Sequence, residues 1–275
     1  MVRACSYRDP DPYRHSGDYV AAALPGTPLR LGARLGPFRR LLGRFSRRGL
    51  YEWVVARTRY VDDVFERFGP SMAQVLIMGA GYDSRAIRFE GALRSARVFE
   101  VDAPAPQADK RRGLELRKLP VPANLVFVAV DFETQSAATR LAEAGFRPGL
   151  ATLFVLEGLT MYLEPATVDG TLQTVADLAG GGSVLVFDYA YADVVGGDEA
   201  RFGARGTMDA VAGVGESWRF GIEEGTVREF VSRYGFELID DASPAELERR
   251  FLTDPSGRIH GRVNGTQAIA TARRP

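Results

Sequence analysis

Short apolar segments recur along the chain, and most of them end at a polar or acidic residue. Their starting points, near residues 75, 98, 125, 152 and 183, lie 23 to 31 residues apart, which is the length of one strand plus one helix in a parallel sheet. Uninterrupted apolar strands are typical of a sheet that helices cover on both faces. The pattern predicts five parallel strands, at 74–78, 98–102, 125–130, 152–156 and 183–187.

Helical spacing of apolar residues occurs before, between and after these strands. One predicted helix begins at Pro165 and ends before the glycines at 180–182, because proline suits a first helical turn and glycine a helix end. Together the elements predict an α/β fold of the Rossmann-like type, with a seven-stranded, mostly parallel sheet and helices on both faces. The helices are predicted at 54–68, 166–178 and 223–234, and the two remaining strands at 236–239 and 267–271.

Two glycines follow the first predicted strand, and an acid follows the second. Gly79-Ala80-Gly81 turns the backbone toward a helix, and Asp102 stands at the end of the next strand. This arrangement is typical of a βαβ unit that binds an adenosine ribose, because the glycines allow close approach and the carboxylate accepts from the hydroxyls. We therefore expect a nucleotide-like cofactor.

Further acids follow the other strands. Right-handed crossovers put the carboxyl ends of parallel strands at one edge of the sheet, where ligands bind. Asp131, Glu157 and Asp188 follow the third, fourth and fifth predicted strands. The sequence therefore predicts that these side chains lie at the same edge as Asp102.

Composition narrows the classes of protein to which the chain can belong. Its 275 residues include 35 basic and 35 acidic side chains, so no global field favours nucleic acid. The single cysteine, Cys5, excludes an intramolecular disulfide and a multi-cysteine metal site, and we expect no metal. No apolar run is long enough to span a membrane and the N-terminus lacks a signal-peptide core, so we expect a cytoplasmic protein with no membrane partner.

An arginine-rich segment, residues 30–48, precedes the first long helix. No acid occurs between Asp18 and Glu52, and leucines and phenylalanines are interleaved with the arginines. Two interpretations stay open, a solvated basic surface and a lid over a negatively charged substrate. We therefore divide the chain into an N-terminal helical lid or substrate-capping segment, residues 1–52, and a cofactor-binding domain, residues 53–275.

The glycine turn favours S-adenosylmethionine over a dinucleotide. A dinucleotide fold needs a third glycine where this chain has Ser84, which argues against an NAD-dependent dehydrogenase. S-adenosylmethionine has no phosphates, so a shorter glycine turn suffices for it. Its ammonium and carboxylate need an acid and a base nearby, which Glu157 and an arginine can supply.

These motifs resemble those of the leucine carboxyl methyltransferase family, over roughly residues 50 to 190. The family includes enzymes that esterify the C-terminal leucine of protein phosphatases, and bacterial natural-product enzymes of the tetracenomycin polyketide type, which this chain resembles more. The resemblance implies a class I methyltransferase domain with S-adenosyl-L-methionine as cofactor and S-adenosyl-L-homocysteine as product. It is carried by Ala56-Arg57, the string from Leu76 to Arg85, the string from Phe99 to Pro104, Ala129–Phe132, and Glu157-Gly158-Leu159-Thr160-Met161-Tyr162-Leu163.

The resemblance also implies a role for each matched residue. Arg57 would bind the methionine carboxylate, and Glu157 the ammonium. Asp102 would accept from the ribose hydroxyls. Asp131 and Phe132 would contact adenine, whereas Arg85 and Arg88 are expected to be structural partners of strand-end acids. The implied cofactor-binding residues are Arg57, Gly79, Ala80, Gly81, Asp102, Asp131, Phe132, Glu157 and Gly158.

The methyl acceptor is less determined than the cofactor. An ionised carboxylate needs no general base, whereas a phenol, with a pKa of about 10, benefits from one. The chain has two histidines, so we favour methyl-ester formation on a small aromatic or polyketide-like acid. A phenolic O-methyltransferase and a non-catalytic cofactor-binding protein stay open. Candidate acceptor-site residues are His15, Tyr162, Tyr191 and Arg205 or Arg219. The aromatic residues Tyr162, Tyr189, Tyr191, Trp218 and Phe220 either form an aromatic wall for a flat acceptor or pack in the core.

Overall fold

A computed structural model describes residues 2–24, 48–132, 134–213 and 217–275. One mixed sheet organises the molecule, with the strand order β3-β2-β1-β4-β5-β8-β7. The predicted Rossmann-like α/β fold is therefore confirmed. The strands are β1 (Gln74–Met78), β2 (Arg97–Asp102), β3 (Leu125–Ala129), β4 (Thr152–Leu156), β5 (Val184–Tyr191), β6 (Gly221–Ile222), β7 (Glu237–Ala242) and β8 (Gln267–Arg273).

The first five strands run parallel to one another, and β8 enters between β5 and β7 in the antiparallel direction. The sheet contains an eighth strand that the apolar pattern did not predict. This strand, β6, has two residues and pairs with the end of β5. It is too short to give a periodic signal, because strand patterns need about four residues to be recognised.

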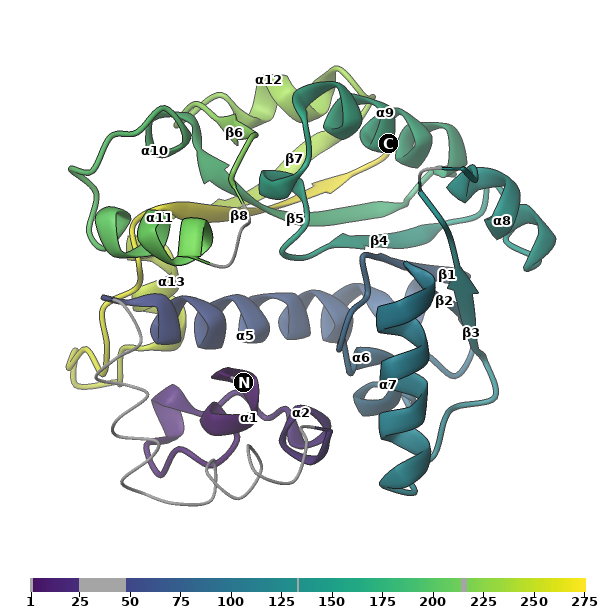
Figure 1. The fold of residues 1–275 in the computed structure, drawn as a ribbon, viewed down its shortest axis with the longest axis horizontal. Coiled ribbons are helices and arrows are strands. Elements are labelled where there is room, and N and C mark those ends of the chain that lie inside the picture. Colours follow the sequence, from purple (N-terminus) through teal and green to yellow (C-terminus); the bar gives the residue numbers. More distant parts are fainter. Residues whose placement is uncertain (1, 25–47, 133, 214–216) are drawn as a thin grey trace.

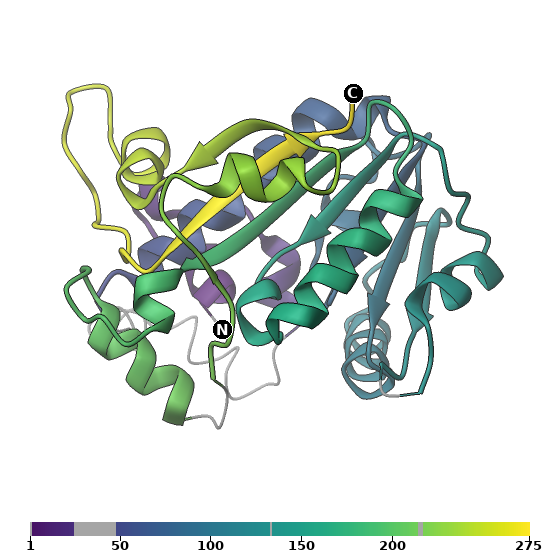
Figure 2. The ribbon, with the colours of Figure 1, turned by 90° about the horizontal axis from the view of Figure 1, so that it is seen from above.

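Helices cover both faces of the sheet, as predicted (Figure 1). The long helix α5 crosses one face, and α9 and α12 lie across the other, which Figure 2 shows from above. The helices are α1 (Val2–Ser6), α2 (Tyr19–Ala23), α5 (Leu50–Phe68), α6 (Arg85–Arg88), α7 (Pro104–Leu116), α8 (Ala137–Glu143), α9 (Pro165–Leu178), α10 (Ala192–Val195), α11 (Ala204–Gly213), α12 (Val227–Ser232) and α13 (Pro244–Phe251), with a 3-10 turn at Thr160–Tyr162.

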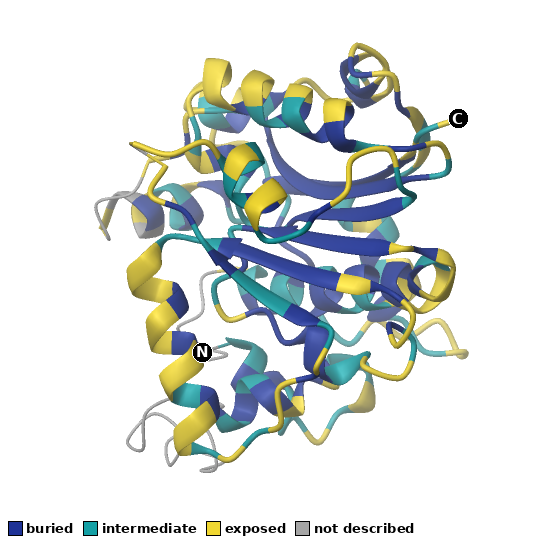
Figure 3. Ribbon diagram, turned by 90° about the vertical axis from the view of Figure 1, so that its right-hand side faces the viewer, coloured by how far each residue is buried: buried dark blue, intermediate teal, exposed yellow. Residues whose placement is uncertain are grey.

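Alternate residues of each strand enter two different hydrophobic cores. On β1, Val75 and Ile77 pack in the core that contains α5, whereas Leu76 and Met78 pack in the core that contains α9 and α12. Successive strand side chains point to opposite faces, so both faces must be apolar. Figure 3 shows the result, a band of buried strands between helices whose outer faces are exposed.

One predicted helix differs in the structure. The helix predicted at 223–234 is shorter, because Gly225 has a φ of +82° and residues 223–226 form a turn before α12 begins. The boundary expected between residues 52 and 53 falls inside α5. At the N-terminus, α1 packs against both α2 and α5. The arginine-rich segment lies outside the described residues except for Arg48. Across the described ranges, no helix combines the length and apolar character needed to cross a membrane.

Candidate active site

The glycine turn after β1 has a backbone that only glycine adopts easily. Gly79 and Gly81 have φ values of +63° and +47°, in the left-handed region. A Cβ atom on Gly79 would lie 3.2 Å from Cδ1 of Leu159, which is closer than most packed carbons approach. The N–H of Ala80 donates to the carbonyl of Val101, so the turn is fixed to the end of β2.

Asp102 joins this turn to β2 through both of its carboxylate oxygens. The N–H of Gly81 donates to Oδ2 at 2.5 Å, and the N–H of Ala103 donates to Oδ1 at 2.7 Å. The predicted proximity of the glycine turn and the acid after β2 is therefore confirmed. A carboxylate has about four acceptor positions, so two remain for a ligand.

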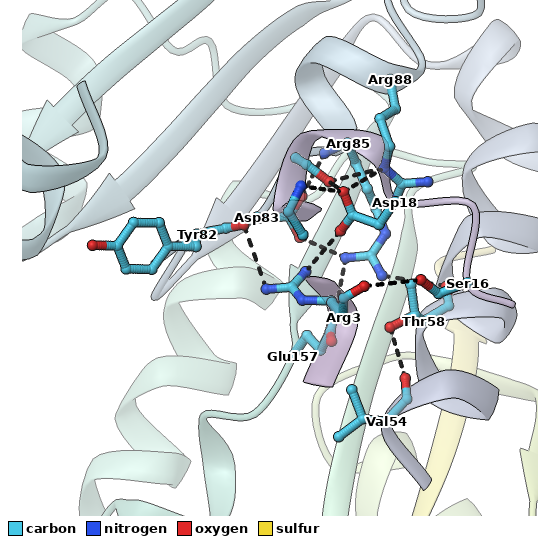
Figure 4. Close-up of polar contacts among 12 residues, drawn as sticks. Arg3, Ser16, Asp18, Val54, Thr58, Tyr82, Asp83, Arg85, Arg88 and Glu157 are labelled. Atoms are coloured by element: carbon cyan, nitrogen blue, oxygen red, sulfur yellow. Dashed lines mark hydrogen bonds and ion pairs between the residues drawn. The ribbon is translucent and has the colours of Figure 1, made fainter. Parts of the chain in front are cut away.

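Arg85 connects three parts of the site. Its guanidinium bonds to Asp83 in the glycine turn, to Asp62 on α5 and to Glu157 after β4, at 2.5, 2.8 and 2.5 Å. The Arg85 side chain is fully buried, and Figure 4 shows it among Asp83, Glu157 and Thr58. The interpretation of Arg85 as a structural partner of a strand-end acid is confirmed. The same interpretation of Arg88 is wrong in its partner, because Arg88 bonds to Asp62 on the helix.

Arg57, on the third turn of α5, lies between two acids, Glu157 after β4 and Asp188 in β5. Its Nη1 donates to Oδ2 of Asp188 at 2.6 Å, and its Nε lies 3.0 Å from Oε1 of Glu157. Asp188 also accepts from the N–H of Gly158 at 2.6 Å. Gly158 has a φ of +66°, and its missing Cβ leaves room for Arg57 Nη1, 3.4 Å away. The sequence placed Asp188 at this edge but gave it no role.

Two atoms of this cluster are buried without a hydrogen bond. They are Nε of Arg57 and Oε1 of Glu157, which face each other only as an ion pair. Burial favours the neutral form of Glu157, but Arg85 and Arg57 outweigh it and hold the pKa of that carboxyl well below its usual range. A ligand that carries both an ammonium and a carboxylate would satisfy these two atoms, so the residues fit the amino-acid end of S-adenosylmethionine.

Beneath Asp102, a buried ion pair joins β2 to α7. Lys110 Nζ lies 2.5 Å from Oε2 of Glu100, and both side chains are buried. Burial raises the pKa of Glu100 to about 7, although Lys110 lowers it. This pair was not among the predicted site residues, although an acid within an apolar strand is a visible signal. The pair aligns β2 with the helix that follows Asp102.

The two predicted adenine contacts lie after β3. Val130 donates its N–H to the carbonyl of Asp102, so the chain leaves β3 beside the end of β2. Asp131 and Phe132 follow, and Phe132 is 55% exposed. Thr134 Oγ1 donates to Oδ2 of Asp131 at 2.8 Å. The structure therefore brings these residues to the edge that carries Asp102, with an aromatic ring open to a ligand.

The N-terminal residues contact the glycine turn. Asp18, at the start of α2, accepts from the hydroxyl of Ser84 at 2.8 Å, and Arg3 donates to the carbonyl of Tyr82 (Figure 4). His15 accepts from the N–H of Gly17, and its ring lies beside that of Tyr7. Within the described residues, no contact joins His15 to the glycine turn.

His260 holds the N-terminal residues against a C-terminal loop. Its Nδ1 lies 2.7 Å from Asp11, its Nε2 lies 3.1 Å from Asp254, and its ring stacks on that of Tyr13. Both ring nitrogens face carboxylates, so the charged imidazolium satisfies both contacts and the neutral ring only one. The hydrogen bonds to Asp254 and Asp11 raise the pKa of His260.

The candidate acceptor residues do not all gather at one place. Tyr162 is 36% exposed in the turn after Glu157. Tyr191 is buried beneath the guanidinium of Arg201, and burial raises its pKa. Tyr189 is directed away from Arg57, because its hydroxyl donates to Asp241 on β7.

The two candidate arginines already have carboxylate partners, Glu199 for Arg205 and Glu164 for Arg219. Trp218 is different, because its indole N–H is buried and has no acceptor among the residues that the structure describes. The neighbouring N–H of Arg219 donates to the carbonyl of Met161, so Trp218 lies over the turn after β4. In the part of the chain that the structure describes, no group of three or more metal-ligating side chains occurs.

Comparison with known proteins agrees with this geometry. The leucine carboxyl methyltransferase family matches residues 36–176, more than half of the chain. A Streptomyces avermitilis protein named as an S-adenosyl-L-methionine-dependent methyltransferase is 29% identical over 260 residues, or 90% of this chain and 86% of that protein. YktD of Bacillus subtilis, similarly named, is 29% identical over 188 residues, or 66% of this chain and 59% of YktD. The chain thus spans less than two thirds of some relatives.

Solved structures share the fold. A Thermobifida fusca protein named as a methyltransferase superposes with a TM-score of 0.60 at 17% identity, covering 100% of this chain and 94% of that one. A Burkholderia thailandensis protein of an O-methyltransferase family superposes with a TM-score of 0.51 at 12% identity, covering 79% and 56%. These identities establish the architecture alone. On the family match, the chain belongs to the leucine carboxyl methyltransferase family and is an S-adenosyl-L-methionine-dependent methyltransferase.

Proposed function

We propose that this protein is an O-methyltransferase that esterifies a carboxylate of a small aromatic acid, of the kind found in polyketide-like natural products. The observation that supports this choice is the position of the histidines. His260 lies between Asp11 and Asp254, and His15 accepts from Gly17; the described hydrogen bonds and ion pairs join neither to Arg57 or Glu157. An acceptor that is already ionised needs no base, and carboxylates are ionised at neutral pH.

The proposed roles of the cofactor residues follow from their contacts. Glu157 would exchange its ion pair with Arg57 for the cofactor's ammonium, and Arg57 would bind the cofactor's carboxylate while Asp188 keeps it oriented. The two remaining acceptor positions of Asp102 would take the ribose hydroxyls. Phe132 would lie on the adenine.

When bound, the sulfonium supplies an activated methyl group, and the chain's own residues place the acceptor oxygen in line with it. Correct placement contributes roughly 7–11 kcal/mol to such a reaction, so a dedicated acid or base is not required. Trp218 and Tyr162 would line the acceptor side, where the buried indole N–H could donate to an acceptor oxygen.

A matched pair of acceptors tests the proposal. The protein is incubated with methyl-labelled S-adenosylmethionine and either 2-naphthoic acid or 2-naphthol, which share one ring system. We expect label on the acid, and release of labelled methanol after alkaline hydrolysis, because esters hydrolyse and aryl ethers do not. Label on the naphthol alone would establish phenolic O-methylation instead. Binding of S-adenosylhomocysteine without transfer to either acceptor or a wider acid panel would favour a non-catalytic cofactor-binding protein.

A further inference from the structure

An arginine-lined hollow of about 740 Å³ lies beside the end of β5, apart from the glycine turn. Three segments form it: Arg48, two residues before α5; residues 199–209, which lead into and begin α11; and the loop before β8. None of the cofactor residues described above lines this hollow. Its charged and aromatic lining residues are Arg48, Arg201, Arg205, Arg262, Phe202, Glu199 and Asp209.

Close backbone packing holds these three segments together. Asn264 is 1% exposed; its N–H donates to the carbonyl of Gly49, and its side-chain amide donates to the carbonyl of Arg48 and the hydroxyl of Thr207. A Cβ on Gly49 would lie 2.5 Å from the backbone nitrogen of Asn264, and one on Gly203 would lie 2.4 Å from the carbonyl oxygen of Arg48. Only glycine fits at both places, so the hollow has a tightly packed frame.

Two of the arginines in the hollow form no ion pair with a carboxylate of the described residues. Arg205 pairs with Glu199, and Arg201 pairs with Asp193 and Glu224. Arg48 and Arg262, by contrast, have no carboxylate partner among residues 2–24, 48–132, 134–213 and 217–275. The remaining acid of the lining, Asp209, is exposed on α11. The hollow therefore has unpaired guanidinium groups that can bind an anion.

The hollow also contains a cation–π contact. The guanidinium carbon of Arg262 lies over the ring of Phe202, 4.0 Å from its centroid. Guanidinium groups bind carboxylates through paired N–H donors, and both guanidinium and phenyl faces pack on aromatic rings. A carboxylate attached to an aromatic ring combines the two properties that this surface recognises.

The first turns of α5 connect the hollow to the cofactor residues. Arg48 precedes α5 by two residues and Arg57 lies seven residues into it, about 10 Å from the helix start at 1.5 Å per residue. We propose that the arginine hollow binds a second acidic group of the methyl acceptor, a carboxylate on an aromatic ring, while the oxygen that is methylated lies at the cofactor site. The inference rests on the proposed function for the identity of its ligand as the acceptor.

Calorimetric titration with 2-naphthoate tests the site without requiring turnover. The wild-type protein is first saturated with S-adenosylhomocysteine, so that Arg57 is occupied, and then titrated with 2-naphthoate or with uncharged 2-naphthamide. We expect Arg48→Gln and Arg262→Gln each to weaken naphthoate binding by about tenfold or more, the loss of a charge-assisted hydrogen bond. Arg228→Gln, at an exposed position on α12 that does not line the hollow, is the matched control and should change nothing.

Each outcome bears on the hollow separately from the proposed function. No naphthoate binding to the wild type, equal binding of the amide, or unchanged affinity in both hollow variants would overturn the inference. Competition between naphthoate and S-adenosylhomocysteine would also overturn it, because the anion would then occupy the Arg57 site. If binding depends on Arg48 and Arg262 but no acid is ever methylated, the hollow stands as an aromatic-acid site and the proposed function fails.

Discussion

Substitution of Asp102 by asparagine gives the most direct measure of the cofactor site. In the structure the carboxylate accepts from two backbone N–H groups, of Gly81 and Ala103, and has about two acceptor positions left. Asparagine has one oxygen, with two acceptor positions, and an amino group that cannot accept. Asp102→Asn must therefore lose either a contact that holds the glycine turn or one that binds the ribose.

The expected loss follows from the number and kind of hydrogen bonds. Losing one charge-assisted hydrogen bond costs about 1.5–3 kcal/mol. The dissociation constant for S-adenosylhomocysteine should therefore rise about 10- to 150-fold, measured by calorimetric titration. Asp177→Asn is the control, because Asp177 is an exposed acid on α9 that accepts a hydrogen bond from Gln173.

A deoxyribose ligand separates loss of ribose contacts from disruption of the turn. For the wild type, S-adenosylhomocysteine lacking the 3′-hydroxyl should bind more weakly than the normal ligand. For Asp102→Asn that difference should shrink, because the partner of the hydroxyl is already impaired. Affinity for the normal ligand within threefold of wild type, or an undiminished deoxyribose penalty, would refute the assignment of Asp102 to the ribose.

Three further predictions test other parts of the site. Asp188→Asn should lower stability by about 1–3 kcal/mol, seen as a lower Tm, because Asp188 is buried and bonds to both Arg57 and Gly158; an unchanged Tm would contradict this. Trp218→Phe should raise the KM for the methyl acceptor about three- to tenfold, which corresponds to the loss of a hydrogen bond of about 1 kcal/mol. The affinity for S-adenosylhomocysteine should stay unchanged. A change confined to cofactor binding would show that the indole does not contact the acceptor. The pKa of His260 is raised in the folded protein, so its stabilising contacts are complete below pH 6.5 and are lost as the pH rises through that raised pKa. The difference in Tm between the wild type and His260→Gln should therefore shrink between pH 6 and pH 9. A difference that grows with pH would contradict the assignment of His260 as an imidazolium.

The strand alternation explains why the acids of the site share one face of the sheet. On β5, Val184 and Val186 pack in the core that contains α5, so Asp188 continues on that face and meets Arg57. Leu185 and Phe187 pack in the opposite core, so Tyr189 follows them away from Arg57. Of the two interpretations of Tyr189, acceptor wall or core, the two-residue period therefore favours the core.

The sequence by itself determined the elements of the fold and the edge at which the site lies. Apolar runs, glycine turns and proline starts are local signals, and parallel topology sends the end of every such strand to one edge. The tertiary structure alone decided which charges pair there. Arg57 and Asp188 lie 131 residues apart and Arg85 and Glu157 lie 72 apart, so no local pattern could connect them. A buried arginine pairs with the acids that packing brings close to it. These ion pairs form only when α5, the glycine turn and the ends of β4 and β5 pack together.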